Sequence, residues 1–488
     1  MIVDLNSQTF SLRSSNILVK ITVYVMMMAL ILAGAAPSFA DERENSGEST
    51  ETAASADIDW SDAPSIEGTS GIIMDAGSGT ILYEKNAYER RDPASITKIM
   101  TSLITLETLD MDQEVTVPAE AVAPDDSGTN IDLKEGEVLT VEQLLYGMML
   151  ESGNDAADTL AIAISGSIES FAELMNERAA ACGAEDTTFI SASGLSEYGE
   201  DHNLTTAYDI AMIAREAMKN PEFRQVVSTA RYTIPATNMS DRRTLRNTDV
   251  CLYEEDETIE VSGIERPFKY DGTTGIKTGY TGTAGNCFCG SAQKDDTELI
   301  AVSLNSTSEE QRFADVMALW DYGFSKYYTY TAAAGRQNLD EFRVWQGEKS
   351  HVAVGISEDM DITLNEGYDS DNITVEAVKD DGAIKAPVEK GDRLGQLIAY
   401  DENGEAVATA DLVAMESVEK GGILSYIGIA DEDIIFFVLG IIGILILLIL
   451  IRMLYVRSRR KKRKRRRAER TRHVRRKEWE KEKNPFGN

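Results

Sequence analysis

The feature that most constrains this chain is an apolar run from Ile434 to Leu450, which continues to about Tyr455. Roughly 20 such residues cross a bilayer as a helix, whose backbone satisfies its own hydrogen bonds. The run is apolar on every face, which favours a membrane helix over a buried core helix. From Arg452 onward, 18 Lys or Arg stand against 4 Glu, a net charge of +14 that leaves −48 on the rest of the chain. We therefore expect a transmembrane helix at 434–455, a basic cytoplasmic tail at 456–488 and an acidic bulk outside the cytoplasm.

The basic tail has two interpretations. In isolation, the run from Arg457 to Arg467 could bind nucleic acid. Directly behind a membrane helix, however, it is more simply a topology determinant that contacts anionic lipid headgroups. We expect membrane lipids as partners of the helix and tail, and no nucleic acid.

The N-terminus is typical of an export signal. Arg13 and Lys20 precede the apolar stretch from Ile21 to Ala33, and Ser38 and Ala40 are small residues at the two positions that signal peptidase reads. We expect a signal peptide at 1–40, cleaved after Ala40, rather than an uncleaved first anchor. An acidic, Ser- and Thr-rich disordered linker follows at 41–63.

The pattern of residues 64–330 predicts one α/β (α+β) domain. A hairpin is expected first, at 71–75 and 80–84. Helical periodicity then covers 96–109, 141–147, 156–164, 168–182 and 207–218, and strand patterns return at 275–280, 286–292 and 299–304 before a closing helix at 314–324. This order predicts an antiparallel sheet assembled from both ends of the domain, flanked by helices and carrying a helical insert.

Residues 337–419 show a different sequence pattern. Short alternating strands such as 352–356, 361–364 and 397–400 are separated by turns such as Glu402-Asn403-Gly404. This pattern predicts a small all-β domain, and we expect it to act as a spacer between the catalytic domain and the membrane.

Cysteine and histidine provide no metal site. Cys182, Cys251, Cys287 and Cys289 lack CxxC or other regular spacing, and small buried thiols are the favoured interpretation. The three histidines are far apart in sequence. We therefore expect no metal, no cofactor and no Ser-His-Asp triad.

Three short motifs carry the chemistry: Ser95-Ile96-Thr97-Lys98, Ser152-Gly153-Asn154 and Lys277-Thr278-Gly279. The first two also occur by chance elsewhere, but Lys-Thr-Gly occurs once, and the order of the three motifs removes the competing matches. The rejected serines are Ser14, Ser291, Ser303, Ser370 and Ser417.

The residue types suit acyl transfer. Ser95 is expected in the first turn of a helix, where free N–H groups favour negative charge, and Lys98 lies three residues on, on the same face. A serine nucleophile needs a base, and burial beside a second cation, here Lys277, lowers the pKa of a lysine enough to make it one. The hypothesis is that Lys98 accepts the Ser95 proton and Ser152 relays a proton to the leaving amine.

We expect the remaining site residues to bind substrate. Asn154 orients the substrate amide, and Lys277 and Thr278 bind the terminal carboxylate of the substrate. Gly279 allows the substrate backbone to approach the strand edge.

This ordered set resembles the penicillin-binding protein and serine β-lactamase superfamily. It is most similar to the low-molecular-weight, serine-type D-alanyl-D-alanine carboxypeptidases, over about Pro64 to Glu419. The supporting segments are 71–86, 94–101, 145–157, 189–195 and 272–285, together with the trailing β-rich domain and the membrane-proximal C-terminus. The resemblance implies an oxyanion hole made by the backbone N–H groups of Ser95 and Tyr280.

The implied function is penicillin-sensitive removal of the terminal D-Ala from peptidoglycan pentapeptide stems, at a bacterial plasma membrane that the chain spans once, with the catalytic domain outside. Its partners would be peptidoglycan stem peptides, and β-lactams would be covalent inhibitors. Two alternatives remain open: a serine β-lactamase, although no Glu-x-x-Leu-Asn sequence lies between Ser152 and Lys277, and a catalytically inactive wall-binding ectodomain.

Three departures from the family stand out. Asn305 to Ser308 occupy the stretch where many relatives place a carboxylate-binding arginine, and the next arginine is Arg312. The acidic stretch from Tyr253 to Glu260 looks like an insertion. Relatives often end in an amphipathic helix that lies on the membrane, whereas this chain is expected to span it.

Overall fold

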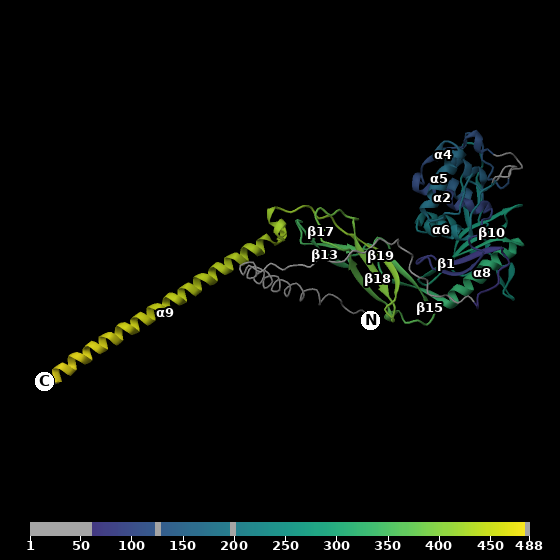
Figure 1. Cartoon of the computed structure of the whole chain (residues 1–488). Coiled ribbons are helices and arrows are strands. Elements are labelled where there is room, and N and C mark those ends of the chain that lie inside the picture. Colours follow the sequence, from purple (N-terminus) through teal and green to yellow (C-terminus); the bar gives the residue numbers. More distant parts are fainter. Residues whose placement is uncertain (1–60, 123–127, 196–201, 484–488) are drawn as a thin grey trace.

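A computed structural model describes residues 61–122, 128–195 and 202–483 (Figure 1). The expected signal peptide, and nearly all of the expected linker, lie outside the described residues.

The α/β domain is built on a five-stranded antiparallel sheet with the order β2-β1-β11-β10-β9. Its strands are β1 (Ser70–Asp75), β2 (Ile81–Lys85), β9 (Thr273–Thr281), β10 (Gly285–Lys294) and β11 (Thr297–Ser306). Strand β1 pairs with β11, so the N-terminal hairpin adds directly to the C-terminal meander, as the sequence predicted. Strand β9 is left at an edge, where a site can form.

Helices cover both faces of this sheet. They are α2 (Lys98–Thr108), α3 (Val141–Leu150), α4 (Asn154–Ser165), α5 (Ile168–Ala181), α6 (Ala207–Met218), α7 (Pro221–Val227) and α8 (Glu309–Lys326), with 3-10 turns η1 (Ala94–Thr97), η2 (Ala119–Ala121) and η3 (Val250–Leu252). Alternate residues of β1 point to opposite faces. Ile72 packs into the core formed by α2 to α7, and Ile73 into the core under α8. The predicted α/β architecture with a helical insert is confirmed.

Three small hairpins decorate this domain. They are β3 (Glu114–Thr116) with β4 (Val138–Thr140), β5 (Arg231–Ile234) with β6 (Arg243–Arg246), and β7 (Thr258–Val261) with β8 (Ile264–Pro267). The last one contains the end of the acidic insertion. Ile259 and Val261 of β7 are buried in the α8 core, so the insertion is an ordered part of the fold.

The second domain is all-β. Its strands are β12 (Tyr327–Ala333), β13 (Asp340–Trp345), β14 (His351–Gly355), β15 (Met360–Asn365), β16 (Thr374–Lys379), β17 (Ile384–Lys385), β18 (Arg393–Tyr400) and β19 (Ala406–Ala414), with the turn η4 (Ser370–Asn372). Strand β12, which the sequence did not predict, leaves α8 directly and pairs with β15. Turns η5 (Ile423–Ile427) and η6 (Asp431–Asp433) then lead into helix α9 (Ile434–Lys483). Figure 1 shows α9 leaving the β-rich domain as one long rod.

Asp75 fastens the two domains together. It ends β1, is fully buried, and its Oδ2 accepts hydrogen bonds from the hydroxyls of Thr329 and Thr363 of the β-rich domain, both at 2.8 Å. The Ser78 hydroxyl lies 2.6 Å from that of Thr363. The five-stranded sheet and the β-rich domain are therefore joined by buried and partly buried polar contacts as well as by the chain.

Candidate active site

Ser95 lies in the short turn η1, immediately before α2. The preceding Ala94 has a left-handed φ of 48°, and its N–H donates to Asp92 Oδ1 at 2.8 Å. Asp92 Oδ2 also accepts from the Thr283 hydroxyl at 2.6 Å, which ties the turn after β9 to the turn that carries Ser95. Ser95 thus lies in a 3-10 turn just before the helix, and this turn is hydrogen-bonded to the segment that follows β9.

Lys98 begins α2 and is completely buried. Its Nζ lies 2.9 Å from Ser95 Oγ, 2.8 Å from Asn154 Oδ1 and 2.6 Å from the Ser193 carbonyl oxygen. Burial lowers the pKa of Lys98 to about 7, although Asp158 and Asp155 oppose the shift. The amine is therefore partly neutral at neutral pH and in contact with the serine hydroxyl.

Ser152 and Asn154 lie where α3 gives way to α4. Ser152 is nearly buried and has a left-handed φ of 63°. Asn154 is the first residue of α4, and its backbone N–H donates to the Thr129 carbonyl at 2.8 Å. The sharp turn between the helices thus brings the Asn154 side chain onto Lys98.

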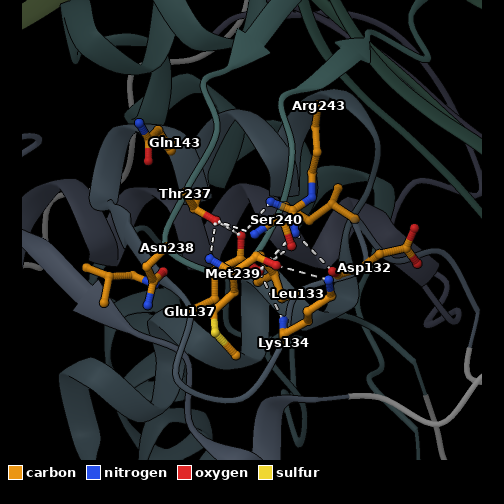
Figure 2. Close-up of polar contacts among 12 residues, drawn as sticks. Asp132, Leu133, Lys134, Glu137, Gln143, Thr237, Asn238, Met239, Ser240 and Arg243 are labelled. Atoms are coloured by element: carbon orange, nitrogen blue, oxygen red, sulfur yellow. Dashed lines mark hydrogen bonds and ion pairs between the residues drawn. The ribbon is translucent and has the colours of Figure 1, made fainter.

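The loop beside Asn154 is held from two sides. The Asp155 carboxylate accepts from the backbone N–H groups of Ile131 and Leu133. Further along, fully buried Glu137 makes a bidentate pair with Arg243, at 2.7 and 2.9 Å (Figure 2). Because Arg243 begins β6, the β5–β6 hairpin is clamped onto this loop.

Strand β9 carries the third motif along the edge of the sheet. Lys277 and Thr278 are buried, and the Thr278 hydroxyl lies 2.6 Å from that of Thr248. A Cβ added to Gly279 would lie 3.0 Å from the Pro93 carbonyl oxygen and 3.1 Å from the Ser95 nitrogen. Gly279 therefore allows β9 to lie against the Ser95 turn, and Tyr280, which follows it, is largely exposed.

Arg312 comes to the same strand from α8. It is almost fully buried, and its Nη1 donates to the Gly279 carbonyl at 3.3 Å, while Nη2 pairs with Glu309 at 2.7 Å. Ser308 caps α8 by accepting from the Gln311 N–H, which fixes the start of the helix one turn before Arg312. Arg312, the first arginine after the stretch Asn305 to Ser308, thus lies beside the Lys-Thr-Gly strand in space.

Several buried ionisable side chains lie around β9. Burial lowers the pKa of Lys277 well below its usual value, and the nearby charges of Lys98 and Arg312 lower it further. Fully buried Asp249 has its pKa raised by burial to about 7. We predicted that a second cation helps to lower the pKa of Lys98. In the structure neighbouring cations lower the pKa of Lys277, whereas burial lowers the pKa of Lys98.

The predicted residues fall into one region. Direct contacts join Ser95, Lys98 and Asn154, and Gly279 places the β9 residues against Ser95. The rejected motif serines lie elsewhere: Ser291 is buried in β10, and Ser417 is exposed in the β-rich domain.

Sequence reasoning missed the supporting residues Asp92, Ser193 and Asp249. Asp92 precedes a proline in a turn, and such a position is a common capping site, so its bracing role had a weak signal. Ser193 contributes a backbone carbonyl, for which side-chain chemistry carries no signal at all.

Comparison with known proteins identifies two families that match this chain. The D-alanyl-D-alanine carboxypeptidase (peptidase S11) family profile matches residues 57–308, and that of the penicillin-binding protein 5 C-terminal domain matches residues 329–420. The D-alanyl-D-alanine carboxypeptidase DacF of Bacillus subtilis is 32% identical over 367 residues, which cover 74% of this chain and 88% of the relative. DacC of Escherichia coli is also 32% identical, over 74% and 86% of the two chains.

Solved structures show the same two-domain architecture. Penicillin-binding protein 5 from Haemophilus influenzae superimposes with a TM-score of 0.58 at 26% identity, over 73% of this chain and 99% of that one. Two matched domains in the same order, with the Ser95 and Lys98 pair between the sheet and the helices, leave a single assignment: the chain belongs to the D-alanyl-D-alanine carboxypeptidase family of low-molecular-weight penicillin-binding proteins.

Proposed function

We propose that this chain is a serine-type carboxypeptidase that removes the terminal D-Ala from peptidoglycan stem peptides through an acyl-enzyme on Ser95. The family is one of serine D-alanyl-D-alanine carboxypeptidases, and its members act on such peptides and bind β-lactams. The proposal assigns that activity to the residues of this chain.

The observation that carries the proposal is the environment of the Lys98 amine. Two of its three neighbours, Asn154 Oδ1 and the Ser193 carbonyl, can only accept hydrogen bonds. A neutral amine has two N–H groups and one lone pair. When both N–H groups donate to these oxygens, the lone pair remains for the third neighbour, the Ser95 hydroxyl.

Acylation then proceeds as follows. Ser95 Oγ attacks the carbonyl carbon of the penultimate D-Ala while its proton passes to Lys98 Nζ. The oxyanion is stabilised by the backbone N–H groups of Ser95 and Tyr280. When the C–N bond breaks, Ser152 relays a proton to the leaving amine of D-Ala. Water later attacks the ester, releases the shortened peptide and returns the proton to Ser95.

The substrate is recognised mainly by the buried cations beside Ser95. Lys277 and Thr278 bind the terminal carboxylate, Asn154 orients the amide, and Gly279 keeps the edge of β9 accessible. We add Arg312 to this set, because its guanidinium contacts β9 at Gly279 and would there take the role of the carboxylate-binding arginine that many relatives carry in the stretch Asn305 to Ser308.

The C-terminal helix supports a membrane anchor. Helix α9 is long and apolar enough to cross a bilayer, with a mean hydropathy of 3.6 in its apolar window. The basic residues that follow would stay in the cytoplasm and contact anionic lipid, so the catalytic domain would be on the outer side.

The experiment that tests this function is covalent labelling of the full chain by a penicillin, with peptide mapping by mass spectrometry, alongside release of D-Ala from a synthetic peptide that ends in D-Ala-D-Ala. We expect one adduct, on Ser95, and D-Ala release. Ser95→Ala should abolish both, while the matched control Ser417→Ala, which removes an exposed serine of a second Ser-x-x-Lys sequence, should change neither.

The outcomes separate the alternatives. Rapid release of the penicillin adduct without D-Ala release would indicate a β-lactamase. A folded chain that forms no adduct and releases no D-Ala would indicate a wall-binding ectodomain.

A further inference from the structure

An apolar patch lies beside the start of the membrane helix. It consists of Ile423, Tyr426 and Ile427 of η5, which are 90%, 62% and 70% exposed, together with Trp345 at the end of β13, which is 39% exposed. A Cβ on Gly428 would lie 3.2 Å from the Trp345 ring, so the indole packs against the end of η5. Trp345 therefore lies beside the end of the turn that carries the three exposed residues, and we call these four side chains the apolar patch.

The patch is not a fraying end. The η5 turn places Ser425 inward, and Ile429 and Ala430, which follow Gly428 after the turn, are buried as well. The Gly421 N–H donates to the Gln346 carbonyl at 2.9 Å. The turn is thus fixed on the β-rich domain, with apolar residues sorted to its outer side.

The acidic residues next to the patch are engaged by the protein. Asp431 accepts from the Gly422 N–H at 3.0 Å, and Glu432 Oε1 accepts from both the N–H and the hydroxyl of Ser350, at 2.8 and 2.6 Å. Asp433 is buried. Asp431 therefore closes the η5 segment on itself, and Glu432 fastens the segment to the β-rich domain.

The patch is also continuous with the bilayer-crossing segment. Only the turn Gly428 to Asp433 separates it from Ile434, where α9 and its apolar run begin, and the Asp433 N–H folds back onto the Ala430 carbonyl at 2.9 Å. Figure 1 shows α9 starting at the end of the β-rich domain that carries β13 and β17. A bilayer around α9 would thus have its outer surface at the level of η5.

The chemistry of the patch fits that surface. Tyr and Trp gather at the headgroup level of membranes, where an apolar ring and a polar group are both satisfied. Arg343 lies 4.4 Å from the Trp345 ring centroid and adds a cation at the same level. An exposed aliphatic and aromatic cluster of this kind marks an interaction site.

We propose that Ile423, Tyr426, Ile427 and Trp345 form a second membrane contact, which inserts into the outer leaflet beside α9 and fixes the orientation of the ectodomain on the membrane. This inference rests on the proposed insertion of α9. Because η5 is bonded to the β-rich domain, and Asp75 joins that domain to the catalytic sheet, the contact sets the direction in which the active site faces.

The test uses single cysteines in the full chain, reconstituted in lipid vesicles at low protein density. The four native cysteines are buried, so an added cysteine can be labelled with an environment-sensitive fluorophore. The test positions are Ile423→Cys and Ile427→Cys. Leu447→Cys in α9 reports membrane insertion, and the matched control is Ile264→Cys, an equally apolar, 66% exposed residue of the catalytic domain.

We expect blue-shifted emission at 423 and 427, quenching there by lipids that carry a nitroxide near the headgroup, and protection from aqueous iodide, with none of these at 264. If 447 is quenched by lipid but 423 and 427 behave like 264, the patch faces water and the inference is wrong while the anchor stands. If position 447 is not quenched either, both the membrane insertion of α9 and the second membrane contact are wrong. Protection at 423 and 427 that grows with protein density, without lipid quenching, would assign the patch to a second copy of the chain and overturn the lipid contact.

Discussion

The rate at which Ser95 attacks a β-lactam should follow the protonation of Lys98. Burial lowers the pKa of this amine from 10.5 to about 7. About half of the molecules would then hold a neutral base at pH 7, whereas an unperturbed lysine would be neutral in about one molecule in 3000. Because only the neutral amine can accept the serine proton, the rate of acylation should rise about tenfold per pH unit below pH 7 and level off about one unit above it.

The assay is stopped-flow acylation of the full chain by a fluorescent penicillin, from about pH 5 to about pH 10. Lys98→Met keeps the length of the side chain without the amine, and should lower the acylation rate by about 100- to 10,000-fold at every pH. Ser417→Ala, remote from the site, should keep the wild-type profile.

Thermal unfolding provides an independent check with a defined sign. The folded-state pKa of Lys98 lies below its unfolded value, so between pH 7 and 10.5 the unfolded state binds more protons. The contribution of Lys98 to stability is therefore unfavourable below pH 7 and is relieved as the pH rises through this window. Lys98→Met should raise the Tm most at acidic pH, unlike a variant that only damages the fold.

Two results would refute this reasoning. An acylation rate that keeps rising in proportion to hydroxide up to pH 10 would mean that Lys98 retains an ordinary pKa. A rate that stays flat down to pH 5 would mean that another group takes the proton.

Three further predictions follow from the contacts around the site. Arg312→Gln should raise KM for a D-Ala-D-Ala peptide by about 10- to 100-fold, measured by D-Ala release, because a charged hydrogen-bond donor near the carboxylate is lost; an unchanged KM would remove Arg312 from the carboxylate site. Glu137→Gln should lower the free energy of unfolding in urea by about 3 kcal/mol, because Arg243 is left without its buried partner, and a loss below about 0.5 kcal/mol would contradict this. Burial alone would raise the pKa of Glu137, but its hydrogen bonds from Arg243 and Thr237 hold the pKa below 4.5. The stabilisation that Glu137 gives the wild-type protein should therefore be present above pH 4.5, and it should be lost as the pH falls through the lower pKa of the folded state. Gly279→Ala should slow acylation of Ser95 by about tenfold or more with an unchanged circular dichroism spectrum, since the new methyl group pushes β9 off the Ser95 turn, and full activity would show that the turn yields.

Local pattern was enough to predict the sheet strands, most of the helices and the central pair of the site. Ser95 and Lys98 are three residues apart at a helix start, so their contact follows from helical geometry, and the single Lys-Thr-Gly sequence selected the matching partners. The helix predicted at 207–218 has the bounds of α6, because Thr206 is a strong N-cap and the apolar residues keep helical spacing.

Tertiary placement could not be read in the same way. Arg312 is 35 residues from Lys277 in sequence, and only the packing of α8 across β10 and β11 brings it to Gly279. The pattern predicted that burial beside a second cation lowers the pKa of Lys98. In the structure burial lowers it, and the depth of that burial depends on the whole fold. Strand β12 was not predicted because its Tyr, Thr and Ala residues are only half-buried and because the strand continues directly from a helix.

The same burial that makes Lys98 a base also favours an anionic substrate. Lys277 and Arg312 lie in the interior beside it, and burial disfavours the charged form of each. Asp249 is the buried carboxyl that could offset them, but its own pKa is raised to about 7, so it neutralises only part of that charge at neutral pH. A substrate carboxylate placed at Lys277 would favour the charged form of that lysine and so raise its pKa. We therefore expect a peptide that ends in a free carboxylate to bind beside Lys277 and Arg312 more tightly than the same peptide with its carboxylate amidated, and equal binding of the two would contradict this.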